Sequence, residues 1–130
     1  MKPTIKQALK GAAIAAVVAI ILNEIWDLVG VKLLGFQNPT SDFQIRIVLS
    51  TLIPILIAGG LYFLLEKYTS MGTLIFQVVT LTLTLLSLYS SFMTTWPDGT
   101  VVSPDFPVLS IPMHLIAGLS ATFLIPKFSK

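Results

Sequence analysis

Four long apolar stretches set the strongest limit on how this 130-residue chain folds. Each continues for about 20 residues, which is the length that an α-helix needs to cross the roughly 30 Å hydrocarbon core of a bilayer. The predicted spans cover residues 10–30, 45–65, 72–93 and 107–126. Of all residues, 55% are apolar and only 11% are charged, whereas a soluble domain has about 25% charged residues. We therefore predict an integral membrane protein with a single domain, residues 1–130.

The third span contains TLTLTLLSLYSS, which alternates apolar and hydroxyl side chains as a barrel strand does. Its apolar character continues for roughly twice the length of a membrane strand, and a barrel needs at least about eight strands. We therefore predict an all-α, four-helix antiparallel transmembrane bundle. The start of the chain resembles a secretory signal, but no small-residue cleavage site follows GAAIAAVVAIIL, so we expect a retained membrane helix.

The basic residues are distributed unequally between the two ends of the predicted bundle. Six of the eight lie on the side of the termini: Lys2, Lys6, Lys10, Lys67, Lys127 and Lys130. The other side has only Lys32 and Arg46, together with most of the acidic residues. Because cytoplasmic loops are enriched in Lys and Arg, both termini are predicted to be cytoplasmic.

Several functions find no support in the sequence. The chain has no cysteine, which excludes disulfides and thiolate metal sites, and it has no basic run typical of nucleic-acid binding. It also has no phosphate loop, no cluster of metal ligands and no Ser-His-Asp arrangement. We therefore expect no enzymatic activity, no metal and no nucleic-acid partner.

Polar residues follow one face of the third span at spacings of three and four: Thr73, Gln77, Thr80, Thr84, Ser87 and Ser91. One interpretation is that these hydroxyls bond to their own helix and allow close packing. The other is a wet groove or ligand path. A matching face on the first span is small in its inner half and polar in its outer half: Ala8, Ala12, Ala16, Ala19, Asn23 and Asp27.

The only histidine, His114, is about seven residues inside the fourth span, and Asn23 is at a similar depth in the first span, roughly 10 Å below the outer boundary. The candidate binding layer at this depth consists of His114, Asn23, Glu24, Ser87, Thr84 and Ser110. It is interpreted as an interhelical hydrogen-bond cluster, a small-molecule or pigment site, or a proton or ion path. We expect a neutral, bundle-facing His114 that is hydrogen-bonded to Asn23 as first choice and Glu24 as second.

Other polar and aromatic residues are expected at the outer side. Asp27 is expected to be solvated there, and Glu24 to extend toward headgroups or water, with a proton-coupled role as the alternative. The two long connections are expected to cap the bundle, with Trp26 and Trp96 in the aromatic belt. The seal of this cap is predicted to consist of Phe92, Phe106 and Val108.

Two stretches carry a resemblance to a known family: AAVVAIILNEIWDLVGVKL in the first span and MHLIAGLSATFLIP in the fourth. The chain resembles an uncharacterised bacterial family of small four-helix membrane proteins, catalogued only as a domain of unknown function. The resemblance implies the fold and a bacterial inner membrane, but no activity. Glu24 and Asp27 stand where more apolar residues are expected for that family. The four helices and Glu24 are also similar, more weakly, to small multidrug exporters.

Three classes of function remain open. The first is an accessory or structural membrane subunit that contacts the lipid bilayer and other membrane subunits or further copies of itself. The second is a binding protein for a lipid, quinone, haem or chlorophyll-like molecule, with His114 as ligand or hydrogen-bond donor; the cofactor itself is unknown. One histidine per chain makes no bis-histidine haem site without a second subunit. The third is a small oligomeric transporter or proton-coupled exporter.

Overall fold

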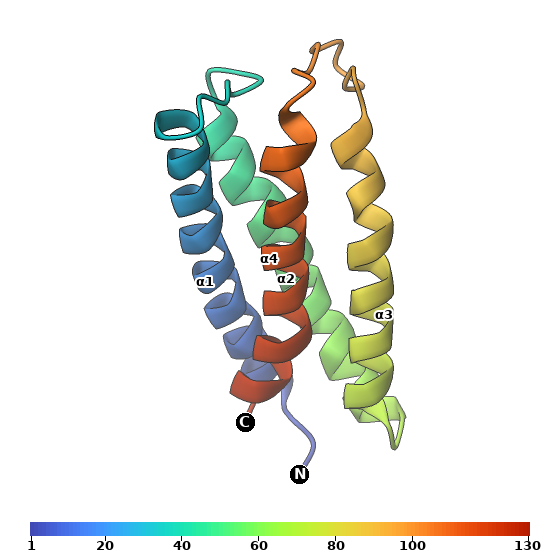
Figure 1. The fold of residues 1–130 in the computed structure, drawn as a ribbon. Coiled ribbons are helices and arrows are strands. Elements are labelled where there is room, and N and C mark those ends of the chain that lie inside the picture. Colours follow the sequence, from blue (N-terminus) through green and yellow to red (C-terminus); the bar gives the residue numbers. More distant parts are fainter.

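The computed structural model describes residues 1–130 and is all-helical, as predicted. Four long helices run antiparallel to their sequence neighbours, and all four are long and apolar enough to cross a membrane (Figure 1). They are α1 (Ile5–Lys32), α2 (Phe43–Tyr68), α3 (Gly72–Ser87) and α4 (Phe106–Phe128), with the 3-10 helix η1 (Leu88–Phe92) continuing α3. The third predicted span therefore changes from an α-helix to a tighter helix in its last turn.

The two ends of the bundle differ in their connections. Residues 33–42 and 93–105 form long loops at one end, here called the loop end (Figure 1). Both termini and the short link 69–71 lie at the opposite end, here called the terminal end. There the Lys10 Nζ donates to the Lys130 carbonyl at 2.9 Å and the Lys2 Nζ to the Lys67 carbonyl at 3.1 Å.

Helix α1 packs against both α2 and α4 through a face of small residues. The six residues predicted for this face are all buried, and Ala15 joins them. A Cβ atom on Gly59 of α2 would lie 2.6 Å from the Ala12 Cβ, and one on Gly11 would lie 2.6 Å from the Ile125 carbonyl oxygen of α4. Such short distances mean that glycine is needed for the backbones to approach this closely. The face of α1 that meets α2 and α4 therefore consists of backbone and methyl groups over its inner half.

A second apolar cluster closes the loop end, and it includes one residue from the loop 93–105: Phe43, Ile47, Val102, Phe106, Leu109 and Met113. Trp26 and Trp96 pack against it, and the Trp26 Nε1 donates to the Leu109 carbonyl at 2.9 Å. Of the predicted seal, only Phe106 is buried, whereas Phe92 is 63% exposed and Val108 54% exposed. That part of the prediction was wrong because Phe43 and Val102 occupy the space around Phe106.

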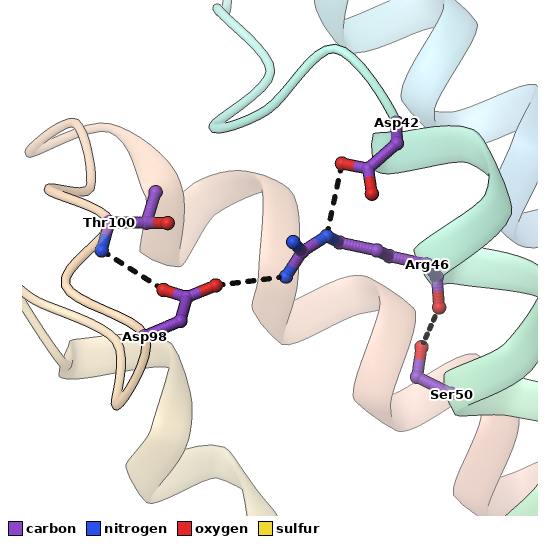
Figure 2. Close-up of polar contacts among 5 residues, drawn as sticks. All are labelled: Asp42, Arg46, Ser50, Asp98 and Thr100. Carbon is purple, nitrogen blue, oxygen red and sulfur yellow. Dashed lines mark hydrogen bonds and ion pairs between the residues drawn. The ribbon is translucent and has the colours of Figure 1, made fainter.

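Arg46 of α2 holds the loop 93–105 against the bundle (Figure 2). Its Nε lies 3.1 Å from Asp42 Oδ1, and its Nη1 lies 3.3 Å from Asp98 Oδ2. The Thr100 backbone N–H donates to Asp98 Oδ1 at 3.0 Å. This backbone hydrogen bond, followed by the interactions with Arg46, lowers the pKa of Asp98 below its usual value. The guanidinium also lies 5.6 Å from the centre of the Trp96 ring.

Candidate functional site

His114 lies in α4, and its imidazole is directed at α3 and η1. Its Nδ1 is 2.9 Å from the Ser87 Oγ and its Nε2 is 3.4 Å from the Ser90 Oγ. The side chain is half-buried between these helices. The predicted hydrogen bond to Asn23 or Glu24 of α1 was therefore wrong. A match in depth selects a layer of the bundle, but it does not select which of the two neighbouring helices an α4 side chain faces.

The His114–Ser87 contact is one step of a series of polar contacts between α3–η1 and α4, here called the polar ladder. The Thr122 Oγ1 donates to the Thr80 Oγ1 at 2.9 Å, and the Oγ atoms of Ser91 and Ser110 lie 2.8 Å apart. Between them, Thr84 packs against Gly118, where a Cβ would clash with its side chain. Each step of three or four residues along α3–η1 matches a step of four along α4 in the opposite direction. An antiparallel helix pair brings such rows together.

Most of the hydroxyls in the polar ladder also bond to their own helix. Thr80 Oγ1 donates to the Phe76 carbonyl at 2.8 Å and Thr84 Oγ1 to the Thr80 carbonyl at 2.7 Å. Ser87 Oγ contacts the Thr84 carbonyl at 2.7 Å. The interpretation of this face as back-bonded, closely packed hydroxyls agrees with these contacts. Two residues of this face differ: the Thr73 Oγ1 donates to Glu66 Oε1 at 2.7 Å near the link 69–71, and the Ser91 Oγ bonds only to the Ser110 Oγ.

Asn23 of α1 faces α2, where its Nδ2 donates to the Thr51 Oγ1 at 3.2 Å. Both side chains are buried, with Asn23 only 2% exposed and Thr51 3% exposed. Sequence reasoning did not include Thr51. A signal was present, because Thr51 is eight residues from the start of α2 and Asn23 is nine residues from the end of α1. The two residues are thus at similar depths.

Asp27, one turn beyond Asn23, is also buried and only 3% exposed. Its Oδ2 accepts hydrogen bonds from the Gln44 Nε2 at 3.2 Å and from the Asn38 Nδ2 at 3.4 Å. The expectation of a solvated Asp27 was therefore wrong. The loop 33–42 brings Asn38 to the carboxylate, and the first turn of α2 brings Gln44. The two amides, one in the loop 33–42 and one in the first turn of α2, were the signal that sequence reasoning missed.

An open groove of about 450 Å³ lies beside this cluster on the outer surface of α1, and it is here called the α1 groove. Its lining consists of Glu24, Ile25, Asp27, Leu28, Val31, Lys32 and Gln44. Three buried oxygens in the same region accept no hydrogen bond from the chain: Asn23 Oδ1, Asp27 Oδ1 and Asn38 Oδ1. Buried polar atoms normally have partners, so a group of three acceptors without donors is unusual.

The candidate layer thus separates into two groups. Thr84, Ser87, Ser110 and His114 belong to the polar ladder, whereas Asn23 and the half-buried Glu24 belong to the α1 side. The polar ladder consists of neutral hydrogen bonds and one packing contact, while the α1 side carries carboxylates and free acceptors. No three His, Asp or Glu side chains of residues 1–130 lie close enough together to hold a metal ion.

Comparison with known proteins agrees with this architecture. The sequence profile of a family of unknown function, DUF6069, matches residues 1–129. The chain belongs to the DUF6069 family. Neither the curated proteins nor the solved structures contain a match to it.

The region that matches DUF6069 includes both groups of polar residues, because it extends over all four helices. The resemblance of the sequence to an uncharacterised family of four-helix membrane proteins is thereby confirmed. The family carries no activity that transfers to this chain. Any functional argument for this DUF6069 protein therefore starts from the polar ladder and the α1 groove.

Proposed function

We propose that this DUF6069 protein is a non-enzymatic accessory or structural subunit of a bacterial inner membrane. The observation that carries this proposal is the use of the polar groups within α3, η1 and α4. Every step of the polar ladder joins two helices, and both nitrogens of His114 already have hydroxyl partners. Side chains engaged in this way stabilise a rigid helix pair, which is the role expected of a structural subunit.

The packing of α1 supports the same proposal. Its alanine face, together with Gly11 in the same helix and Gly59 of α2 opposite, brings three helices into close contact, which favours a rigid body over a lumen. The large outward-facing apolar side chains suit contact with lipid or with the helices of other membrane subunits. We place both termini in the cytoplasm, because six of the eight basic residues lie at the terminal end.

Purification from native membranes at native expression level tests this function. We expect native mass spectrometry in a mild detergent to give a defined complex with a constant subunit ratio. The purified chain should show no absorbance band in the visible range. Proteoliposomes that contain it should show no proton flux above that of empty vesicles. A pigment band that His114→Ala removes, or flux that Glu24→Gln removes, contradicts the proposal and supports a binding protein or a transporter instead.

A further inference from the structure

The α1 groove combines an acidic and an apolar wall at the loop end of the bundle. Glu24 and Asp27 contribute carboxylates, while Ile25, Leu28 and Val31 contribute apolar surface. Its volume of about 450 Å³ falls within the range of roughly 300–1,000 Å³ typical of small-molecule sites. The groove lies on the outside of α1, within about two turns of its end. A ligand in it would therefore be amphiphilic and would lie close to the headgroup region.

The carboxylate of Asp27 is buried without a positive partner. Its Oδ2 receives hydrogen bonds only from the neutral amides of Gln44 and Asn38, and its Oδ1 receives none. Both ion pairs of residues 1–130 involve Arg46, so neither Asp27 nor Glu24 is paired with Lys32. Burial of an ionised carboxylate is unfavourable unless a cation or further donors compensate it. The groove thus fits a ligand that carries both positive charge and N–H donors.

We propose that the α1 groove binds an aminophospholipid, with its primary ammonium at Asp27 and Glu24. The N–H groups would donate to the half-buried Glu24 carboxylate, and the positive charge would lie beside the buried Asp27 carboxylate, which lines the same groove. Lys32, exposed at the end of α1, lines the same groove and is placed for the lipid phosphate, five residues or about 7.5 Å along the helix from Asp27. Ile25, Leu28 and Val31 face the glycerol and acyl chains.

The donor requirement makes the proposal specific. A primary ammonium has three N–H groups, whereas the trimethylammonium of phosphatidylcholine has the same charge and no N–H group. Phosphatidylglycerol has hydroxyl donors but a net negative charge, which the two carboxylates repel. The site should therefore prefer phosphatidylethanolamine to both, and stepwise N-methylation of the lipid should weaken binding in steps.

The test uses the full chain in nanodiscs made of equal parts of phosphatidylethanolamine, phosphatidylcholine and phosphatidylglycerol with identical acyl chains. The protein is then released from the nanodiscs, and native mass spectrometry identifies the lipids that remain bound to it. We expect at least about fivefold more bound phosphatidylethanolamine than either other lipid, a factor that corresponds to about 1 kcal/mol. Asp27→Asn should bring the ratio close to one, and Lys32→Ala should lower phosphatidylethanolamine retention several-fold.

Two further variants separate binding from folding. Leu28→Trp fills the groove from an exposed position without altering a carboxylate, so it should abolish the preference even if Asp27→Asn fails to fold. Asp105→Asn removes an exposed acid outside the groove at the same end of the bundle and should change nothing. Equal retention of phosphatidylethanolamine and phosphatidylcholine overturns the proposal, as does a preference that survives in Leu28→Trp. Neither result depends on whether the protein is an accessory subunit.

Discussion

The imidazole of His114 is held by two serine hydroxyls, one at each ring nitrogen. A neutral imidazole has one donor and one acceptor, so one of the two hydroxyls accepts from it, while the other donates to it in place of the carbonyl of its own helix. Interhelical hydrogen bonds of this kind in membranes average about 0.6 kcal/mol, with a maximum near 1.7 kcal/mol. The shorter contact, to Ser87, joins α3 to α4 and is the one that should stabilise their association.

A double-mutant cycle measures this contribution. We expect His114→Ala and Ser87→Ala each to destabilise the protein, with a coupling free energy of about 0.6 kcal/mol between them. Unfolding in mixed micelles by a denaturing detergent supplies the free energies. Ser50→Ala is the matched control, because Ser50 bonds only to carbonyls of its own helix, and its effect should add to that of His114→Ala. Additive effects of His114→Ala and Ser87→Ala would show that the contact does not couple the helices.

At the level of residues, the α3–η1 side of the polar ladder was predictable from the sequence, but the pairing with α4 was not. Spacings of three and four identified the α3 face, because the helical period places such residues on one side. The partner of Asn23 was not predictable in this way, since a single sequence gives depth along a helix but not the rotation of that helix toward its neighbours. Asp27 illustrates a further limit, as its burial depends on the fold of the loop 33–42.

At the level of elements, α1 and α2 approach each other closely at Gly59. The Cβ that alanine would add there lies 2.6 Å from the Ala12 Cβ, below the distance that carbon atoms adopt without displacement. Its neighbour Gly60 has no atom within 4 Å of the corresponding position. Two adjacent glycines of one helix thus have different functions, one in helix packing and one without a packing requirement.

Alanine substitutions distinguish them. Gly59→Ala should destabilise the bundle by about 1–3 kcal/mol through overpacking, and Ala12→Gly in the same chain should restore part of the loss. Gly60→Ala should be neutral or stabilising by up to about 1 kcal/mol, because alanine favours helix. Thermal unfolding in one detergent compares all three. Equal effects of the two glycine substitutions would contradict the close approach of α1 and α2.

The loop 93–105 depends on the charge of Asp98. The hydrogen bond from the Thr100 backbone, followed by Arg46, lowers the pKa of Asp98, so the folded-state pKa lies below the unfolded one. The stabilisation is therefore present above the unfolded pKa and is lost as the pH falls through the folded pKa. The Thr100 amide resonance should titrate with a midpoint below the ordinary aspartate pKa of about 3.9 in NMR spectra. Asp98→Asn should abolish this titration, and a midpoint above the ordinary aspartate pKa would contradict the interaction.

Across the whole molecule, the fold class was predictable because the bilayer sets the length and apolarity of each span. The predicted spans lie within the observed helices, apart from the third, which extends one residue beyond η1. The helices run further at several ends than hydropathy indicated. Thr4, for example, begins α1 with a capping box among exposed polar residues, where apolar content carries no signal.

We predict the orientation of the molecule from the distribution of charge between its two ends. Six of the eight basic residues are at the terminal end, and such an excess is typical of the cytoplasmic side. A single cysteine reports it without background, because the chain has none of its own. With Lys2→Cys, a membrane-impermeant maleimide should label the protein only after cell lysis. With Ser41→Cys, in an exposed position at the loop end, it should label intact cells. The reverse pattern would place the termini outside, and with them the lysines that the positive-inside rule assigns to the cytoplasm.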